Sequence, residues 1–140
     1  AAFWLSTIAP EKMFGLKTVW RGSVKVSVSD PSRTMLDMLS DPRLGGGIRS
    51  VQDIFRNYLG SDAKNLGQLM EYAERLGNGA VFKRLGFLLE ANAPQEIEAI
   101  ERCQHHLTMG NARIDPKMPA EALVVRWRLW VPHDWKAGVK

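Results

Sequence analysis

Cys103, His105 and His106 come closest, among the residues of this chain, to the types and spacing of a metal site. On a helix, Cys103 and His106 would lie three residues apart and share one face. Zinc usually takes four protein ligands, or three and a water molecule, and His133, the remaining histidine, lies far along the chain. We therefore expect no metal ion here. We expect a cysteine in or near the core and two histidines at a helix C-terminus, where the helix dipole favours them.

Cys103 could also act as a nucleophile, with His106 as its base. Residues 95–107 are rich in glutamate, however, and nearby negative charge raises the pKa of a thiol. The chain has no Gly-x-Ser-x-Gly, His-Glu-x-x-His or dinucleotide-binding motif. The glycines at 45–47 are not followed by the Lys-Ser or Lys-Thr of a phosphate-binding loop, so we interpret them as a tight connector. We expect no catalytic residue and no cofactor, and a thiol enzyme is the last alternative.

Basic residues offer a different chemistry, contact with the phosphates of DNA. Lys17, Arg21 and Lys25 lie in the first thirty residues, where bases outnumber acids, and Lys83 and Arg84 stand near the start of a later helix. Bases near a helix N-terminus oppose the helix dipole, so an anionic partner is one explanation for them. The formal net charge of +4 permits a polyanionic partner without requiring one. These five residues are the candidates for DNA contacts, and a solvated surface is the alternative.

Arginine and tryptophan are interleaved near the end of the chain, where Arg126 and Arg128 stand beside Trp127 and Trp130. Single-stranded nucleic acid could stack on an outward-facing tryptophan of such a patch. Core packing combined with cation–π pairing explains the pattern more simply.

The composition indicates a single globular domain over residues 1–140. Hydrophobic residues make up 45% of the chain and charged residues 24%, which suits a sizeable core. A single cysteine cannot form an internal disulfide, and no apolar run approaches the length of a membrane span. We therefore expect a cytoplasmic protein with no membrane partner.

Alternating sequences predict strands at both ends of the chain. Val24, Val26 and Val28 alternate with polar residues, and a turn at 21–23 joins this strand to an earlier one. Residues 123–131 alternate in the same way. We expect this last strand to pair with the hairpin, because a lone strand needs a sheet.

Helical periodicity predicts five helices between these strands. We expect Asn78 to cap the fourth, Ser61 or Asp62 to cap the third, and Ile97 and Ile100 of the fifth to face inward. The fourth helix is apolar over most of its surface and should be the most buried. The expected fold class is α+β: a small, mostly antiparallel sheet, made of the N-terminal hairpin and the C-terminal strand, packed against about five helices.

Asp30, Arg33 and Asp37 mark the junction between the hairpin and the first helix. Asp30 can accept a hydrogen bond from a free N–H of the first turn, and Pro31 suits the first helical position. Arg33 and Asp37 are four residues apart, so they are neighbours on one helix face. We expect a structural role for this motif, a helix cap and an ion pair that is either exposed or partly buried against the sheet.

Several segments together resemble one family, the AbiEi-type antitoxins of bacterial abortive-infection, type IV toxin–antitoxin systems. The similarity covers roughly residues 14–131, and the order and spacing of the segments are more specific than any segment alone. They are Phe-Gly at 14–15, Val-Ser-Val-Ser-Asp-Pro-Ser-Arg-Thr-Met-Leu-Asp at 26–37, Gly-Gly-Ile at 46–48, Lys-Arg-Leu-Gly-Phe-Leu-Leu-Glu at 83–90 and Trp-Arg-Leu at 127–129.

The resemblance implies a regulatory protein without catalytic residues. Such proteins carry an N-terminal winged helix-turn-helix that binds operator DNA, followed by a C-terminal domain that supplies the antitoxin activity and can help in DNA binding. The partner is a nucleotidyltransferase-like toxin, and a stable complex with it is not required. The present chain looks like the C-terminal domain, and the winged helix-turn-helix is expected to be absent from it.

The leading hypothesis from the sequence is therefore a non-enzymatic antitoxin and transcriptional-regulator domain that contributes to DNA binding. The alternative from another class is a protein-interaction or dimerisation module without DNA binding, whose contact surface is the acidic helix 95–107 or an exposed sheet edge. Homo-oligomerisation stays open at this point.

Overall fold

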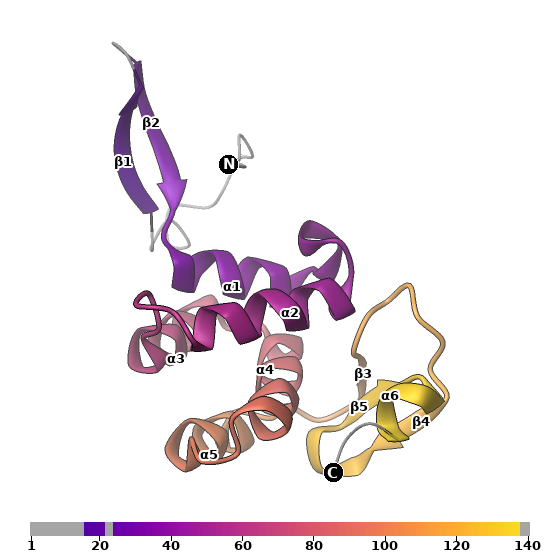
Figure 1. The fold of residues 1–140 in the computed structure, drawn as a ribbon. Helices are drawn as coiled ribbons and strands as arrows, with labels where there is room; N and C mark the ends of the chain where they lie inside the picture. Colours follow the sequence, from indigo (N-terminus) through magenta and orange to yellow (C-terminus); the bar gives the residue numbers. More distant parts are fainter. Residues whose placement is uncertain (1–15, 22–23, 138–140) are drawn as a thin grey trace.

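Along the described part of the chain, one group of strands precedes a series of five helices and another group follows it (Figure 1). The structure is a computed structural model that describes residues 16–21 and 24–137, with the side chains of residues 30–135. β1 (Leu16–Arg21) and β2 (Val24–Ser29) form an antiparallel hairpin, as the alternating sequence predicts. The α+β class predicted from the sequence is confirmed.

Five helices follow the hairpin, and local sequence signals set most of their ends. Asp30 Oδ1 accepts a hydrogen bond from Arg33 N at 2.8 Å, and Asn78 accepts one from Ala80 N at 3.0 Å, so both predicted caps are confirmed. The predicted cap of the third helix is wrong, because Asn65 caps it instead. The helices are α1 (Pro31–Ser40), α2 (Ile48–Leu59), α3 (Leu66–Leu76), α4 (Gly79–Asn92) and α5 (Ile97–His105).

The α4 helix lies at the centre of the core, as its apolar sequence predicts. Every residue from Val81 to Leu89 is buried. The helix packs against α1, against α5 and against the C-terminal segment. Because protein interiors are closely packed, α4 sets the positions of α1, α5 and the C-terminal segment around it.

The α5 helix turns the predicted face to the core, with one exception. Ala99, Ile100 and Cys103 are buried, whereas the side chain of Ile97 is 62% exposed. The prediction was right for Ile100 and wrong for Ile97, because the helix begins only at Ile97 and its first residue projects into solvent.

The predicted C-terminal strand 123–131 is divided into two by a turn. β4 (Ala122–Val124) leads into the 3-10 turn η3 (Val125–Trp127), and β5 (Leu129–Val131) runs back antiparallel to β4. Arg128 has φ 53° and reverses the chain direction between them. β5 also pairs in parallel with β3 (Ala112–Arg113), so this sheet is mixed.

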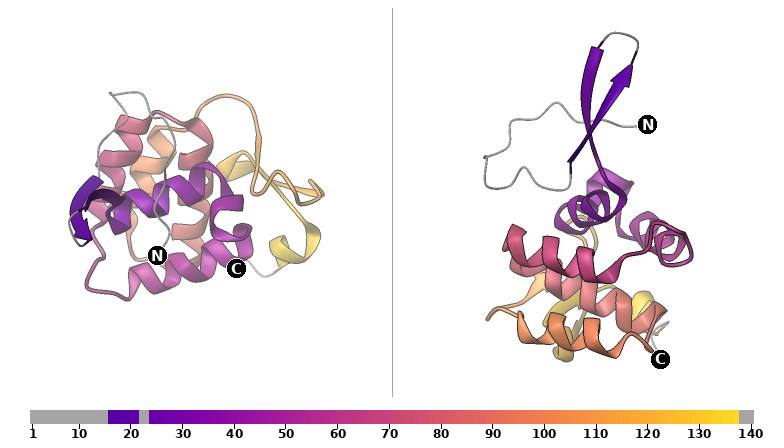
Figure 2. Two further views of the ribbon diagram at one scale, coloured as in Figure 1. Left: turned by 90° about the horizontal axis from the view of Figure 1, so that it is seen from above. Right: turned by 90° about the vertical axis from the view of Figure 1, so that its left-hand side faces the viewer.

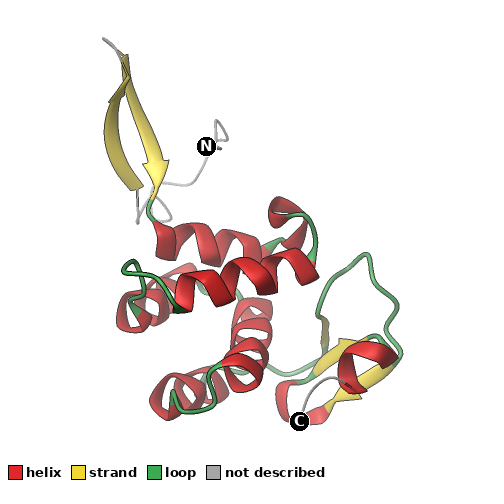
Figure 3. Cartoon of the chain, viewed as in Figure 1, coloured by secondary structure: helices red, strands yellow, loops and turns green. Residues whose placement is uncertain are grey.

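The predicted pairing of the last strand with the hairpin is wrong. The three-stranded sheet has the order β3-β5-β4, and β1 and β2 pair only with each other among the described strands. The two sheets lie on different sides of the helices, as Figure 3 shows. The hairpin extends away from the helices, as two views from different sides show (Figure 1; Figure 2, right), and β2 contacts α1.

The glycines at 45–47 form the predicted tight connector. The 3-10 turn η2 (Pro42–Gly45) precedes Gly46 and Gly47, whose φ angles of 88° and 99° are those that glycine adopts without strain. They bring the start of α2 to Asp115, whose Oδ2 accepts a hydrogen bond from Ile48 N at 3.0 Å. A carboxylate distant in sequence thus caps this helix. The last described element is the short helix α6 (His133–Ala137), and none of the described helices is both long and apolar enough to cross a bilayer.

Candidate functional site

Lys83 and Arg84 lie inside the protein, not on its surface. Their exposed fractions are 4% and 5%. Lys83 Nζ donates to Gly110 O at 2.9 Å, and Arg84 Nη1 donates to Leu39 O at 2.7 Å. Burial lowers the pKa of both side chains. Their predicted role as DNA phosphate contacts is therefore corrected, because their charged ends are held by carbonyl groups of the protein itself.

The Arg84 guanidinium joins three parts of the chain. Besides Leu39 O it contacts Ser40 O at 3.2 Å, and its Nε donates to Arg113 O at 3.1 Å. Leu39 and Ser40 are the last residues of α1, where helical carbonyls lack partners within the helix and favour a positive charge. Arg84 thus caps α1 and holds β3 against α4.

Gly86, in the same segment, completes the attachment of the C-terminal sheet. A Cβ atom on Gly86 would overlap the indole ring of Trp127, which is fully buried. Trp127 Nε1 donates to Glu90 Oε1 at 3.0 Å, one turn further along α4. The C-terminal part of the chain therefore packs on the segment from Lys83 to Glu90. Hydrogen bonds hold it at both ends of this segment, and the Trp127 ring lies on Gly86 in the middle.

The structural motif Asp30, Arg33 and Asp37 is present as predicted. Arg33 Nε lies 3.1 Å from Asp37 Oδ1, and the Arg33 side chain is buried. Burial raises the pKa of Asp37 more than Arg33 lowers it. Asp30 does more than cap α1, because its Oδ2 also accepts a hydrogen bond from Tyr72 Oη at 2.8 Å and so ties α1 to α3.

Lys17, Arg21 and Lys25 lie on the hairpin, with their side chains outside the described residues. The register pairs Lys17 with Val28, Arg21 with Val24 and Lys25 with Trp20. Successive strand positions alternate between faces, so positions 17 and 21 belong to one face of the ribbon and position 25 to the other.

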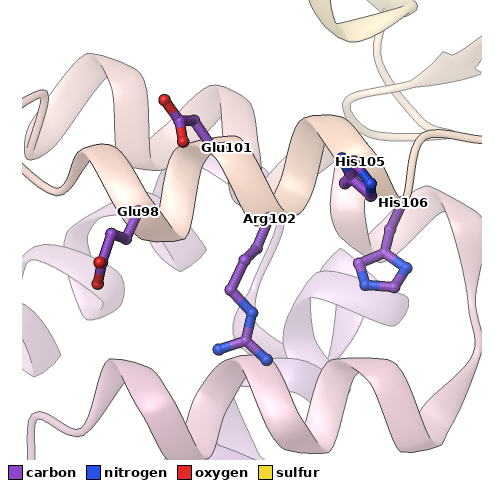
Figure 4. Close-up of a pocket in the computed structure, with 5 residues that line it drawn as sticks. All are labelled: Glu98, Glu101, Arg102, His105 and His106. Carbon is purple, nitrogen blue, oxygen red and sulfur yellow. The ribbon is translucent and has the colours of Figure 1, made fainter.

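A hollow of about 500 Å³ lies along α5, and Figure 4 shows its lining residues, Glu98, Glu101, Arg102, His105 and His106. Glu74 of α3 reaches the same helix, since its carboxylate oxygens lie 2.8 Å from Arg102 Nη2 and 3.0 Å from His106 Nε2. The His106 ring stacks on Phe82 with 4.6 Å between ring centroids. These contacts clamp α5 to α3 and α4.

Cys103 and His106 do not form a reactive pair. Cys103 is fully buried, and its thiol lies 3.9 Å from Met70 Sδ. Burial raises the pKa of the thiol to about 12, so the reactive thiolate is scarce at neutral pH. Within residues 30–135, no three His, Cys, Asp or Glu side chains are grouped to hold a metal ion.

The interleaved arginine and tryptophan residues form an ion pair and a cation–π contact. Arg126 Nε lies 2.6 Å from Glu90 Oε2, and its guanidinium lies 5.3 Å from the centre of the Trp127 ring. The buried Trp127 ring is not available to a nucleotide base. Packing with cation–π pairing, the simpler of the two interpretations, therefore holds for this tryptophan.

Two further hollows are lined by none of the residues that the sequence analysis named as candidate site residues. One is an apolar groove of about 370 Å³ between α1 and α2, where Met35, Met38, Ile54 and Tyr58 contribute to the lining. The other is a polar pocket of about 210 Å³, lined by Arg49, Gln52, Arg56, Ala91, Asn92, Asp134 and Trp135. The spacing of 49, 52 and 56 places those three positions on one helix face, which is the signal that could have revealed the second pocket.

No protein-family model, curated protein or solved structure matches this chain. Of the five predicted DNA contacts, the structure assigns Lys83 and Arg84 to the interior and leaves Lys17, Arg21 and Lys25 on the hairpin. The two groups do not form one surface.

Proposed function

We propose that this chain is a non-enzymatic antitoxin and transcriptional-regulator domain of a bacterial abortive-infection toxin–antitoxin system, acting in the cytoplasm. The proposal rests on the segments in which it resembles the AbiEi-type antitoxins. One observation supports it most. Two of these segments, 26–37 and 83–90, supply the buried polar contacts that join α1, α3, α4 and β3. The residues of these two segments therefore hold the fold together, which suits a resemblance based on a shared fold and not on a shared reaction.

The hairpin is the proposed contact with operator DNA. A two-stranded β-ribbon fits the major groove of B-DNA. The β1–β2 ribbon extends from the helices (Figure 2, right), and its strands contain Lys17, Arg21 and Lys25. Lysine and arginine on such a ribbon would neutralise phosphates and orient the domain on the duplex. Lys83 and Arg84 have no part in this contact.

The DNA contact is tested by duplex binding as a function of salt concentration. Replacement of Lys17, Arg21 or Lys25 by alanine should weaken binding to all sequences, and each lost phosphate contact should flatten the salt dependence by about one unit. Lys117→Ala, which removes an exposed charge elsewhere, is the matched control. Equal salt slopes for the hairpin variants and the control would remove DNA from the proposal.

The antitoxin activity needs a separate test. Co-expression of the protein with a nucleotidyltransferase-like toxin should restore growth of cells that the toxin arrests. Restored growth in the hairpin variants would assign the two activities to different surfaces. Continued arrest despite normal levels of the folded antitoxin would contradict the proposal.

The exposed face of α5 favours a second candidate function, a protein-interaction or dimerisation module. Ile97 is 62% exposed and stands beside Glu98, with Glu101 one turn further on. An apolar side chain among carboxylates suits the edge of an interface with a basic partner. Glu98→Lys with Glu101→Lys should abolish capture of such a partner, or dissociate a homo-oligomer in light scattering. Unchanged association would exclude this face.

A further inference from the structure

Two arginines of α2 line the polar pocket between α2, the end of α4 and α6. Arg49 and Arg56 are about half exposed, and both reach the same hollow of about 210 Å³. Asn92 of α4 and Trp135 of α6 form other parts of its wall. Nothing in the proposed function uses this pocket.

Each guanidinium is held in place by a neutral group on one side. The Arg49 guanidinium lies over the Trp135 ring, 4.8 Å from its centre, and Trp135 is itself buried. Arg56 Nε donates to Asn92 Oδ1 at 2.7 Å. The Asn92 amide is fixed in turn, because its Nδ2 donates to Leu88 O at 2.8 Å and to Gln52 Oε1 at 3.2 Å. The two cations are thus oriented before any ligand arrives, which lowers the entropic cost of binding one.

The remaining contacts of the two arginines are ion pairs that a ligand can replace. Arg49 Nη2 lies 2.7 Å from Asp134 Oδ2, and Arg56 Nη1 lies 3.5 Å from Asp53 Oδ1. Both carboxylates are more than 70% exposed, so these pairs contribute little and are easily exchanged. Arg49 Nε and Nη1 and Arg56 Nη2 have no partner among the described residues. Both guanidinium groups therefore keep donors for an incoming anion.

We propose that this pocket binds a phosphate group, with Arg49 and Arg56 donating to its oxygens while Asp134 moves away from Arg49. Planar guanidinium groups match the tetrahedral oxygens of phosphate with paired hydrogen bonds. The lining carries two positive charges and one negative charge, so the pocket has a net positive charge that attracts an anion. The phosphate belongs either to a small phosphate monoester or to a DNA backbone. The inference is independent of the antitoxin role.

The test is a titration of the folded chain with inorganic phosphate, followed by NMR of the ¹⁵N-labelled arginine side chains. Chloride is exchanged for phosphate at constant ionic strength, so that general screening does not change. The Nε signals of Arg49 and Arg56 should shift and saturate together, whereas that of Arg43, an exposed arginine paired with Asp41, should not shift. Absence of saturation, or an equal shift at Arg43, would overturn the proposal.

Three variants test which groups carry the affinity. Arg49→Gln should weaken phosphate binding by about tenfold or more, as loss of a charge-assisted hydrogen bond does. Arg43→Gln, the matched control, should leave it unchanged. Asp134→Asn should strengthen it by up to about fivefold, the equivalent of one exposed ion pair. Weaker binding by Asp134→Asn would contradict the assigned role of Asp134 as a displaceable counter-ion.

Two competitors identify the source of the phosphate group. Adenosine monophosphate that displaces inorganic phosphate, where a short duplex does not, would indicate a small monoester. Displacement by the duplex would indicate a backbone phosphodiester, and Arg49→Gln should then also reduce duplex binding. Lys17→Ala should leave inorganic phosphate binding unchanged in either case, so failure of the hairpin contact and failure of this pocket are separate results.

Discussion

Gly86 and Trp127 are in direct contact in the folded chain, and no space is left for a side chain on residue 86. A Cβ atom at residue 86 would overlap the six-membered ring of Trp127. The glycine therefore lets the 3-10 turn η3 dock directly on the backbone of α4. The two residues are 41 positions apart in the sequence, and their contact closes the C-terminal sheet onto the helices.

Gly86→Ala should destabilise the fold, against the usual effect of alanine in a helix. Alanine normally favours the helix by about 1 kcal/mol over glycine, but here the methyl group must displace a buried indole, and overpacking of this kind typically costs about 1–3 kcal/mol. Urea unfolding of the variant should show a lower midpoint with a similar slope.

Gly67→Ala is the matched control for this prediction. Gly67 also lies in a helix, α3, and the nearest atom to an added Cβ is Asn65 Oδ1 at 3.7 Å, an ordinary contact. This variant should be neutral or up to about 1 kcal/mol more stable. Equal effects at both positions would show that helix propensity, and not the contact with Trp127, decides the result.

Arg84→Met should destabilise the protein by roughly 2–3 kcal/mol, because a side chain of similar length would leave the carbonyls of Leu39, Ser40 and Arg113 without their donor. Arg84→Lys keeps the charge but cannot reach all three oxygens, so it should fall between wild type and Arg84→Met. Arg43→Met, which removes an exposed arginine, should change the free energy of unfolding by less than about 0.5 kcal/mol. If Arg84→Met changes the free energy of unfolding by no more than Arg43→Met does, the proposed role of Arg84 in joining α1, α4 and β3 is wrong.

Local patterns in the sequence were enough to predict most of the fold. Asp30 and Asn78 lie next to the helices they cap, and helical periodicity predicts the five helices between the strands. Such features depend on residues within one turn of each other, so a single sequence contains them.

Contacts between distant segments account for what the sequence did not predict. Asp115 caps α2 although the two are far apart in the sequence. Arg84 binds carbonyl groups of α1 and β3, so no pattern near residue 84 in the sequence indicates that Arg84 is buried. The turn at Arg128 divides the alternating pattern of residues 123–131, and Trp127 beside this turn packs against Gly86 of α4. For the phosphate pocket, the sequence shows that Arg49 and Arg56 share a helix face, but Asn92 and Trp135 join them only in the folded chain.

Glu74→Gln should reduce the loss of stability in acid. Burial opposes ionisation of Glu74, but its hydrogen bonds with Arg102 and His106 outweigh burial and hold its pKa below the usual 4.5. The unfolded chain therefore takes up the proton first, and the stabilisation present above the unfolded pKa is lost as the pH falls through the folded pKa. Urea unfolding at pH 7 and pH 3 should show a smaller difference between the two pH values for the variant than for wild type.

Glu101→Gln provides the comparison, since Glu101 is exposed on α5 and lies outside the contacts of Glu74 with Arg102 and His106. Its stability should fall with acid as steeply as that of wild type. If Glu74→Gln and Glu101→Gln show the same acid dependence, the clamp between α3 and α5 contributes nothing through Glu74.

Cys103 should be inert in the folded protein and reactive once it unfolds. Its thiol is fully buried, and its pKa of about 12 leaves little thiolate at pH 8. A disulfide reagent that reports free thiols by absorbance should therefore label the native chain slowly, at a rate that rises with urea in step with unfolding, and label one thiol at once in strong denaturant. Rapid labelling of the native chain would place Cys103 within reach of solvent and return the thiol enzyme to consideration. Cys103→Ala separates the two roles further, because it should lower the unfolding midpoint by opening a small cavity beside Met70 while leaving the proposed DNA binding and antitoxin activity unchanged.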